Sequence, residues 1–461
     1  MNNIFNFRAF LNYLKKNKIY TLINVFGLTA SLTFVILIAV YVQQELSVDT
    51  FHRNADRIYV LGSDKDLEHA YRLAYAVRDR YPEIESVCPV IPYNFPDYTV
   101  LVDENKFLTK MLFTDSTFFD FFDFKLQGSK AHALATPGSA VISRTFARKA
   151  FGNEDPVGQI IRIQNSSLLL TVSGVIEDIS NSVIPYGDII VQSGNIRHFN
   201  STMDSKKFSN AGGAYIFLME KENACLQAKT EDMTNFFKEI FWPFIDNMKN
   251  TVTLTPLKKA YFSDIHGYLL RHGDLQFVTI LLSVGLIILI FALINYINLT
   301  VAQSGFRARE MAVRRLLGAS RSELFARMVV ESTFLCFIAF VPAIFFAYTL
   351  LPYSEALLEI KQSLSGLLTP SGILFSIAVI LILGMISGCM PAMIISRVKP
   401  LDVTKGSMVR KNKMVFSKYF IIFQHVITVI LLVTAITVTS QTQYLINAPL
   451  GYNTDNIVLI H

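Results

Sequence analysis

A charged connection between two apolar runs has the residue types best suited to binding another macromolecule. Residues 306–331 read FRAREMAVRRLLGASRSELFARMVVE. Between Arg307 and Arg327 this connection holds six arginines and two glutamates. Arginine side chains donate paired hydrogen bonds to carboxylates, so the composition indicates a docking surface for acidic groups on a partner.

Residues that could carry catalysis or hold a metal are few. One cluster of possible ligands precedes an apolar run: Asp264, His266, His272 and Asp274. It lacks the HxxxH spacing of helical zinc sites, so a loop at the membrane interface is the better interpretation. The sequence has neither a GxxxxGK[ST] phosphate-binding loop nor a GxSxG nucleophile elbow. We therefore expect no enzymatic activity of these classes, and no metal or cofactor in this chain.

The composition is that of a membrane protein. Apolar residues make up 52% of the 461 residues and charged residues only 17%, against about a quarter in soluble domains. Five runs can cross a bilayer as helices: 19–42, 275–302, 332–354, 371–396 and 419–446. His425 is the only acidic or basic residue inside them. Ion-coupled carriers usually place such residues within the bilayer, so an ion carrier is disfavoured, and His425 is interpreted as a packed or interfacial histidine.

The four cysteines give no zinc-site spacing. Cys88 and Cys225 lie between the first two apolar runs and could pair only if that segment faces an oxidising compartment. Cys336 and Cys389 lie in apolar runs and are interpreted as small hydrophobic residues.

The distribution of basic residues predicts the orientation of the five runs. Residues 1–18 carry four basic residues and no acid, 304–327 carry six arginines, and 397–418 carry seven basic residues against one acid. Short cytoplasmic segments are enriched in lysine and arginine. We expect these segments in the cytoplasm, and residues 43–274 and 447–461 outside it. Topology alone thus explains part of the arginine content.

The charged connection also has the pattern of a helix, a turn and a second helix. Four apolar residues share one face of the first helix: Ala312, Val313, Leu316 and Leu317. Gly318 is a typical helix stop, and Ser320 followed by Glu323 forms a capping box that starts the next helix. A topology signal does not require a capped helix leading into the bilayer, whereas a docking site for a cytoplasmic partner does.

Two further segments have recognisable patterns. Residues 1–18 have one apolar and one polar stripe, which predicts a cytoplasmic helix in the membrane interface or an extension of the first span. Residues 43–274 are expected to form a mixed α+β domain with a β-rich lobe inserted at about 95–195. The expected strands are 57–61, 87–91, 168–176, 214–219 and 251–255, and the expected helices are 68–81, 144–151 and 223–241.

Several stretches resemble ABC transporter permeases of the FtsX/MacB-like superfamily. Residues 294–332, INYINLTVAQSGFRAREMAVRRLLGASRSELFARMVVES, resemble the FtsX-type core. MPAMIISRVKPLDVTKG at 390–406 resembles its closing signature. AVISRTFARKAFGNEDPVGQIIRI at 140–163, followed by TVSGVIEDISNS at 171–182, resembles the MacB-type periplasmic domain.

The resemblance implies a fold and a division of the chain. The expected fold class is an α-helical transmembrane bundle with a large mixed α+β extracytoplasmic domain. Residues 43–274 would be the MacB-like periplasmic domain, and 275–396 an FtsX-like core with the second to fourth spans. A cytoplasmic basic loop at 397–418 and a fifth span at 419–446 would follow. Residues 447–461 would start a second extracytoplasmic domain.

The resemblance also implies a partner and a site. The partner would be a cytoplasmic ABC ATPase dimer, which would bind ATP and magnesium. The residues expected to contact it are Arg309, Glu310, Arg314, Arg315, Leu317, Gly318, Ala319 and Ser320. The lipid bilayer and a periplasmic adaptor or substrate are further expected partners, and no nucleic acid is expected. The location would be the inner, cytoplasmic membrane, with the N-terminus in the cytoplasm.

Two functional interpretations follow. The first is a permease that couples ATP hydrolysis in its partner to conformational change outside the membrane, for export or extrusion. The alternative is a membrane-anchored sensor or regulator of cell-envelope processes. The end of the chain resembles its beginning at an offset of 400 residues, with Lys18 matching Lys418 and Gln43 matching Gln443. This internal repeat predicts that the chain is the N-terminal part of a family member with two halves and eight spans.

Overall fold

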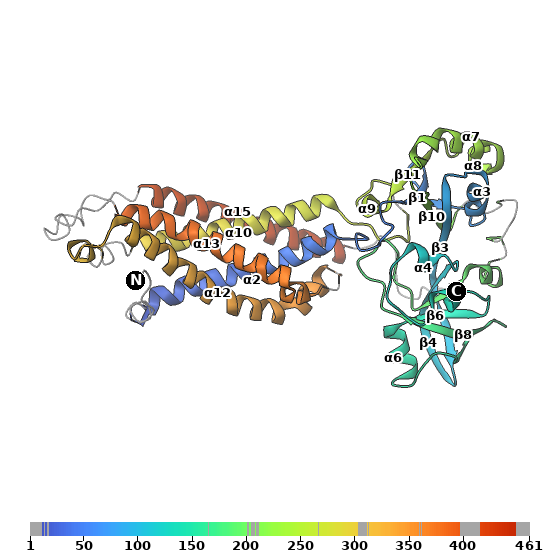
Figure 1. Ribbon diagram of the computed structural model, residues 1–461, viewed down its shortest axis with the longest axis horizontal. Coiled ribbons are helices and arrows are strands. Elements are labelled where there is room, and N and C mark those ends of the chain that lie inside the picture. The colour runs from blue at the N-terminus through green and yellow to red at the C-terminus, as the bar shows by residue number, and fades with distance from the viewer. Residues whose placement is uncertain are drawn as a thin grey trace. The chain divides into compact units, whose positions relative to one another are not determined.

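The structure is a computed structural model (Figure 1). It describes residues 12, 14–15, 18–164, 166–200, 202–203, 208, 212–265, 267–302, 311, 313–358, 360, 362–396 and 415–448. The chain divides into two compact units, one of residues 1–40 with 281–461 and one of residues 41–280. Each unit is described by itself below.

Five long apolar helices are present, as the sequence predicts. They are α2 (Lys18–Leu46), α10 (Leu275–Ala302), α12 (Arg321–Leu358), α13 (Pro370–Ser396) and α15 (Val415–Asn447). Each contains a stretch long and apolar enough to cross a bilayer. Helix α12 begins well before the apolar run expected at 332–354, because a helix start is set by its cap at Ser320 and not by hydrophobicity.

Small residues bring the helices of the first unit together. Ala339, Ala343 and Ala347 recur at one-turn spacing on α12 and are fully buried. The hydroxyls of Thr29 and Thr33 on α2 donate to the backbone oxygens of Ala339 and Ala343, at 3.1 and 3.4 Å. Close helix contact through small residues is how membrane helices gain packing energy, since lipid is as apolar as their side chains.

Helices α12 and α13 approach even more closely. A Cβ atom added to Gly384 would lie 2.4 Å from Cα of Thr333, and one added to Gly388 would lie 2.8 Å from Cα of Val329. Only glycine therefore fits at these two positions of α13. Helix α15 differs from the other four, since no residue between Ile421 and Asn447 is buried in the part of the chain that the structure describes.

The unit of residues 41–280 is built on one sheet of 11 strands. The strands are β1 (Ile58–Ser63), β2 (Glu68–His69), β3 (Ile84–Val102), β4 (Asn105–Thr114), β5 (Leu126–Gln127), β6 (Ser139–Ser143), β7 (Ile160–Ile163), β8 (Leu169–Ile176), β9 (Ile189–Gln192), β10 (Ala214–Glu220) and β11 (Val252–Pro256). The order β11-β1-β10-β3 forms the first part of the sheet.

The second part of the sheet closes into a barrel. Strand β3 pairs with β4 and β7, β7 pairs with β8, β8 with β6, β6 with β9, and β9 with β4. Fully buried side chains fill its interior, among them Met111, Phe113, Ile142, Val172 and Val191. Closure leaves these strands without a free edge, which protects them from pairing with other chains.

Strand β3 belongs to both parts of the sheet. Its residues from Ile84 to Val90 pair with β10. Those from Val90 to Tyr93 and from Tyr98 to Val102 pair with β4, and Val100 and Leu101 also pair with β7. The barrel is therefore joined to the first part of the sheet by a continuous backbone as well as by side chains.

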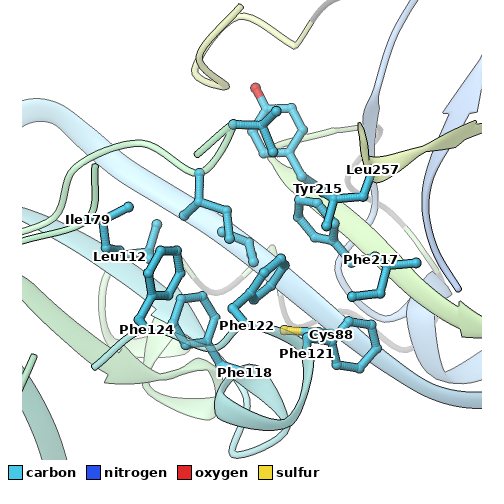
Figure 2. Close-up of a cluster of buried hydrophobic side chains, with 14 of the residues drawn as sticks. Cys88, Leu112, Phe118, Phe121, Phe122, Phe124, Ile179, Tyr215, Phe217 and Leu257 are labelled. Atoms are coloured by element: carbon cyan, nitrogen blue, oxygen red, sulfur yellow. The ribbon is translucent and has the colours of Figure 1, made fainter. Parts of the chain in front are cut away.

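Short helices cover the sheet and complete its cores. They are α3 (Leu73–Arg80), α4 (Phe118–Phe121), α5 (Lys130–Ala133), α6 (Arg144–Phe151), α7 (Thr230–Ile240), α8 (Trp242–Ile245) and α9 (Leu257–Ala260), with 3-10 turns η1 (Ser193–His198) and η2 (Leu226–Lys229). Figure 2 shows the most aromatic core, in which Phe122 packs edge-on against Phe217 with ring centroids 5.2 Å apart.

The structure corrects the start of one helix expected from the sequence. The helix expected at 68–81 begins only at Leu73, because His69 pairs with Ala214 in strand β2 and the Glu68 side chain accepts the hydroxyl of Tyr215 at 2.8 Å. Cys88 is buried, Cys225 is exposed, and both are free thiols.

Candidate functional site

The turn of the charged connection has a defined geometry. Residues 313–316 are helical. The helix ends where Gly318 donates its N–H to the Arg315 carbonyl at 3.1 Å and Ala319 donates to that of Arg314 at 3.0 Å. Gly318 has φ of +100°, a conformation that side-chain-bearing residues rarely adopt. The predicted glycine stop is confirmed in the structure.

The capping box is also confirmed. The backbone N–H of Glu323 donates to Oγ of Ser320 at 3.1 Å, and the N–H of Ser320 donates to Oε2 of Glu323 at 3.0 Å. These two bonds satisfy amide groups that a helix start leaves without partners. Helix α12 thus begins directly after the turn, in a fixed direction.

A small apolar cluster lies beneath the turn. Met311, Leu324, Met328 and Ala392 are buried together, with Ala319 packed against them. Met311 precedes the turn and Leu324 follows it, while Ala392 belongs to α13. The cluster therefore packs the turn against both α12 and α13.

The outer surface of the turn is apolar. Val313, Leu316 and Leu317 are 56%, 66% and 82% exposed. Arg314 and Arg315 are half-buried beside them. We call residues 313–320 the knob. Of the predicted site residues, Arg309 and Glu310 lie outside the described part of the chain, and the other six lie within the knob.

Sequence reasoning missed an ion pair just after the knob. Nε of Arg327 lies 2.9 Å from Oε1 of Glu331, and each side chain is only 9% exposed. The spacing of four residues, one helical turn, was the available signal. Burying an ion pair costs desolvation free energy, and removing one partner costs much more because it leaves an unpaired buried charge. The pair therefore fixes the conformation of the first turns of α12 more than it adds to their stability.

The domain of residues 41–280 is tied to the ends of its two membrane helices. We call residues 41–52 the first leg and residues 261–274 the second leg. The hydroxyl of Tyr261 donates to both carboxylate oxygens of Glu45 at 3.0 Å, so the legs are bonded directly to each other. Within the second leg, Gly273 donates its N–H to the carbonyl of Tyr261 at 2.8 Å.

Both legs converge on one residue of the barrel. The N–H of Val183 donates to Oδ2 of Asp49 at 2.8 Å, and its carbonyl accepts the N–H of Arg271 at 2.9 Å. Val183 lies between β8 and β9, two strands of the barrel. The first leg thus contacts the barrel through Asp49 and the second through Arg271.

Asp49 is held in place by a buried histidine. Nε2 of His52 lies 3.2 Å from Oδ1 of Asp49, and Nδ1 of His52 accepts the N–H of Asp123 at 2.9 Å. Because Nδ1 accepts, the ring proton is on Nε2 and is donated to Asp49. Both side chains are fully buried, so they position the leg and are not open to a substrate.

The possible metal cluster of the sequence gains no support from geometry. Among the described residues no group of three or more His, Cys, Asp or Glu side chains could hold a metal ion. His266 lies outside the described residues. The segment around Asp264, His272 and Asp274 is instead the second leg.

The fold and these connections define a multi-pass membrane protein with a large extracytoplasmic α+β domain. Residues 21–232 match the MacB-like periplasmic core domain, and residues 282–400 match the FtsX-like permease C-terminal domain. The chain therefore belongs to the ABC transporter permeases of the MacB/FtsX type.

Three proteins show similarity to this chain. An uncharacterized ABC transporter permease of Methanocaldococcus jannaschii is 24% identical over 275 residues, which cover 58% of this chain and 62% of the relative. The uncharacterized permease YknZ of Bacillus subtilis is 22% identical over 336 residues, 72% of this chain and 73% of the relative. A crystal structure of a permease domain from Porphyromonas gingivalis aligns with 50% of this chain and 99% of its own length, at 18% identity and a TM-score of 0.38.

Proposed function

We propose that this chain is the permease subunit of an ABC system that carries force across the membrane. A separate cytoplasmic ATPase, acting as a dimer with ATP and magnesium, would contact the knob. The extracytoplasmic domain would change shape in response, for export or extrusion from the periplasm or the outer leaflet. The observation that carries the proposal is an exposed apolar knob that is fixed directly to the start of a membrane helix.

The chemistry of the knob supports docking of a protein. Three apolar side chains that are more than half exposed gain free energy when a partner's groove removes them from water, about 25 cal/mol per Å². The arginines would pair with acidic groups at the rim of that groove. Exposed ion pairs contribute only about 0–1 kcal/mol each, so the apolar contact would supply most of the affinity.

The connection from the knob to α12 supports transmission. The capping box and the buried cluster around Met311 leave few ways for the knob to move without α12. On the other side, both legs are hydrogen-bonded to the barrel through Val183. Side chains and backbone thus provide fixed joints at both ends of the proposed path.

The first test compares two glycines. Neither Gly318 nor Gly366 has an atom within 4 Å of an added Cβ, but only Gly318 has positive φ. Gly318→Val should therefore strain the knob without a clash, at a cost of about 1 kcal/mol or more, while Gly366→Val should not. We expect Gly318→Val to insert normally in the membrane and to impair substrate-stimulated ATP hydrolysis by the partner, with Gly366→Val active.

The second test concerns partner binding. Arg314→Glu combined with Arg315→Glu should reduce co-purification of the ATPase, and Leu317→Asp should reduce it further. The charge reversal should weaken the complex more at high salt if the remaining ion pairs hold it, since salt screens exposed charges. Normal co-purification and normal ATP hydrolysis in all these variants would exclude the knob as the coupling site.

The orientation is part of the proposal and is tested by thiol labelling. Cys225 is exposed on the domain and should react from outside with a membrane-impermeant reagent. Ser320→Cys, in a Cys225→Ser background, should react only after the membrane is opened. Labelling of position 320 in sealed cells would reverse the topology and remove the cytoplasmic ATPase as the partner.

A further inference from the structure

Large apolar side chains are exposed at the ends of the domain that continue into membrane helices. Leu46, the last residue of α2, is 54% exposed, and Phe51 in the following turn is 45% exposed. Tyr268, shortly before α10 begins, is 92% exposed. Exposed aromatic and aliphatic side chains favour contact with a surface that is at least partly apolar.

The length of α2 places Leu46 at a membrane interface. Its 29 residues span about 43 Å at 1.5 Å per residue, close to the 40–45 Å of a bilayer with its headgroups. With Lys18 at one headgroup region, Leu46 reaches the opposite one. The chain then continues in tight turns, in which Thr50 donates its N–H to the carbonyl of Ser47 at 3.2 Å. Phe51 therefore stays near the level of Leu46.

Tyr268 is directed outward by its two neighbours. Leu269 donates its N–H to the hydroxyl of Tyr215 at 2.9 Å. Gly267 lies so close to the same ring that an added Cβ would be 2.1 Å from Cε1 of Tyr215. With residues 267 and 269 held against the domain, the side chain between them projects away from it. The exposure of Tyr268 is thus built into the leg.

Phe51 is presented in a similar way. Its neighbour His52 is buried and bonded to Asp49 and Asp123. The ring of Phe51 contacts His52 at a centroid distance of 4.0 Å and Phe124 at 6.0 Å, and the rest of the ring is open. A side chain supported on one face and open on the other is suited to contact with a surface.

We propose that Leu46, Phe51 and Tyr268 form an interfacial surface that contacts the headgroup and glycerol region of the phospholipids beside the domain. Aromatic side chains prefer this region, where an apolar body and a polar edge are both solvated. Charges of both signs lie close by in the chain, with Arg53 and Asp274 both exposed, which suits zwitterionic lipid. The proposal requires no ATPase and holds for either orientation of the chain.

The test uses the full chain in phosphatidylcholine nanodiscs. Trp242, the only tryptophan, is replaced by phenylalanine, and single tryptophans are introduced as Phe51→Trp or Tyr268→Trp. The matched controls are Leu108→Trp and Met248→Trp, since these residues are 59% and 68% exposed on the same domain but belong to neither leg. Fluorescence is measured with lipids brominated near the headgroup or near the end of the acyl chain.

We expect tryptophan at positions 51 and 268 to be quenched severalfold more than the controls, and more by shallow than by deep bromine. Quenching at either position no greater than at position 108 would overturn the proposal. A second measurement applies if a tryptophan variant fails to fold. A spin label on Tyr268→Cys, with Cys225→Ser, should collide more with oxygen and less with a water-soluble nickel complex than a label on Met248→Cys. Equal accessibility of the two labels would also overturn it.

Discussion

The extracytoplasmic domain and the membrane bundle are stabilised in different ways. The domain buries large side chains completely, including Tyr215, Phe113, Phe122 and Phe217. The bundle instead brings helices together at small residues such as Ala339 and Gly384. In water, burial of large apolar groups supplies the driving force, whereas in lipid the helices gain only close packing and a few hydrogen bonds.

The difference indicates which part can change shape at low cost. A core of interlocked aromatic rings loses several kcal/mol when one ring is displaced, so the domain resists distortion. Smooth helix faces held by small residues can slide with a smaller loss. Motion within the proposed mechanism should therefore begin in the bundle and reach the domain through its legs, with the aromatic core unchanged.

The largest effect is expected in the aromatic core. Phe122→Ala removes a fully buried ring between Phe118 and Phe217, both at centroid distances of 5.2 Å. We expect the domain's free energy of unfolding to fall by about 3–5 kcal/mol, measured by pulse proteolysis of the full chain in urea. Met248→Ala, at a 68% exposed residue, should change it by no more than about 0.5 kcal/mol. Similar losses in both variants would contradict the proposed importance of this core.

The second effect is a pH dependence confined to the domain. Burial lowers the pKa of His69 to about 3, where its ring accepts the hydroxyl of Ser63 at 2.6 Å. The unfolded state takes up a proton near pH 6.5 and the folded state does not. Stability should therefore be full above pH 6.5 and fall on acidification by up to about 1.4 kcal/mol per pH unit, down to about pH 3.

The control for this prediction is His69→Gln, whose amide oxygen can still accept from Ser63. This variant should be less stable at pH 8 but should lose less further stability on acidification. Carboxylates with lowered pKa, such as Asp64 and Asp123, lose their contribution to stability only below about pH 4. The two proteins are therefore compared between about pH 4 and pH 6.5. Equal slopes for the two proteins would show that His69 is not the titrating group.

A third prediction concerns the bundle. Gly384→Leu should push α13 away from Thr333 and destabilise the helix pair by about 1–3 kcal/mol, measured by unfolding in sodium dodecyl sulfate. Gly366→Leu is the matched control, because nothing lies within 4 Å of its added Cβ. If both variants unfold alike, close packing at Gly384 is not what holds α12 to α13.

The smallest effect is expected at the helix cap. Ser320→Ala removes the oxygen that accepts the N–H of Glu323 and should cost about 1 kcal/mol, felt as fraying of the first turn of α12. Hydrogen exchange should rise about fivefold at residues 321–324 and stay unchanged in the domain. Ser320→Asp retains a capping oxygen and should restore slow exchange. Fast exchange in this variant as well would assign the effect to something other than the cap.

Some features of this protein are predictable from sequence because a single local rule determines them. The bilayer requires long apolar helices, and five were expected and are present. The stop at Gly318 and the cap of Ser320 with Glu323 depend only on residues within one turn of each other. These signals need no knowledge of the rest of the chain.

Other features depend on contacts between distant residues and were missed. Strand β6 has only five residues, all buried, so it shows no alternation, and its partners β8 and β9 lie far along the chain. The barrel was therefore expected only as a β-rich lobe. The contact of both legs with Val183 could not be predicted either, because it uses only the backbone N–H and carbonyl of this residue. Every residue has both groups, except proline, which lacks the N–H.

The position of Val183 has a consequence for the kind of input to which the barrel can respond. An equal displacement of the two legs carries Val183 along and preserves its bonds to Asp49 and Arg271. An unequal displacement must stretch at least one of these bonds. Within the proposed mechanism, the loop between β8 and β9 would therefore act as a differential gauge, which responds to the difference between the motions of the two legs and not to their common motion.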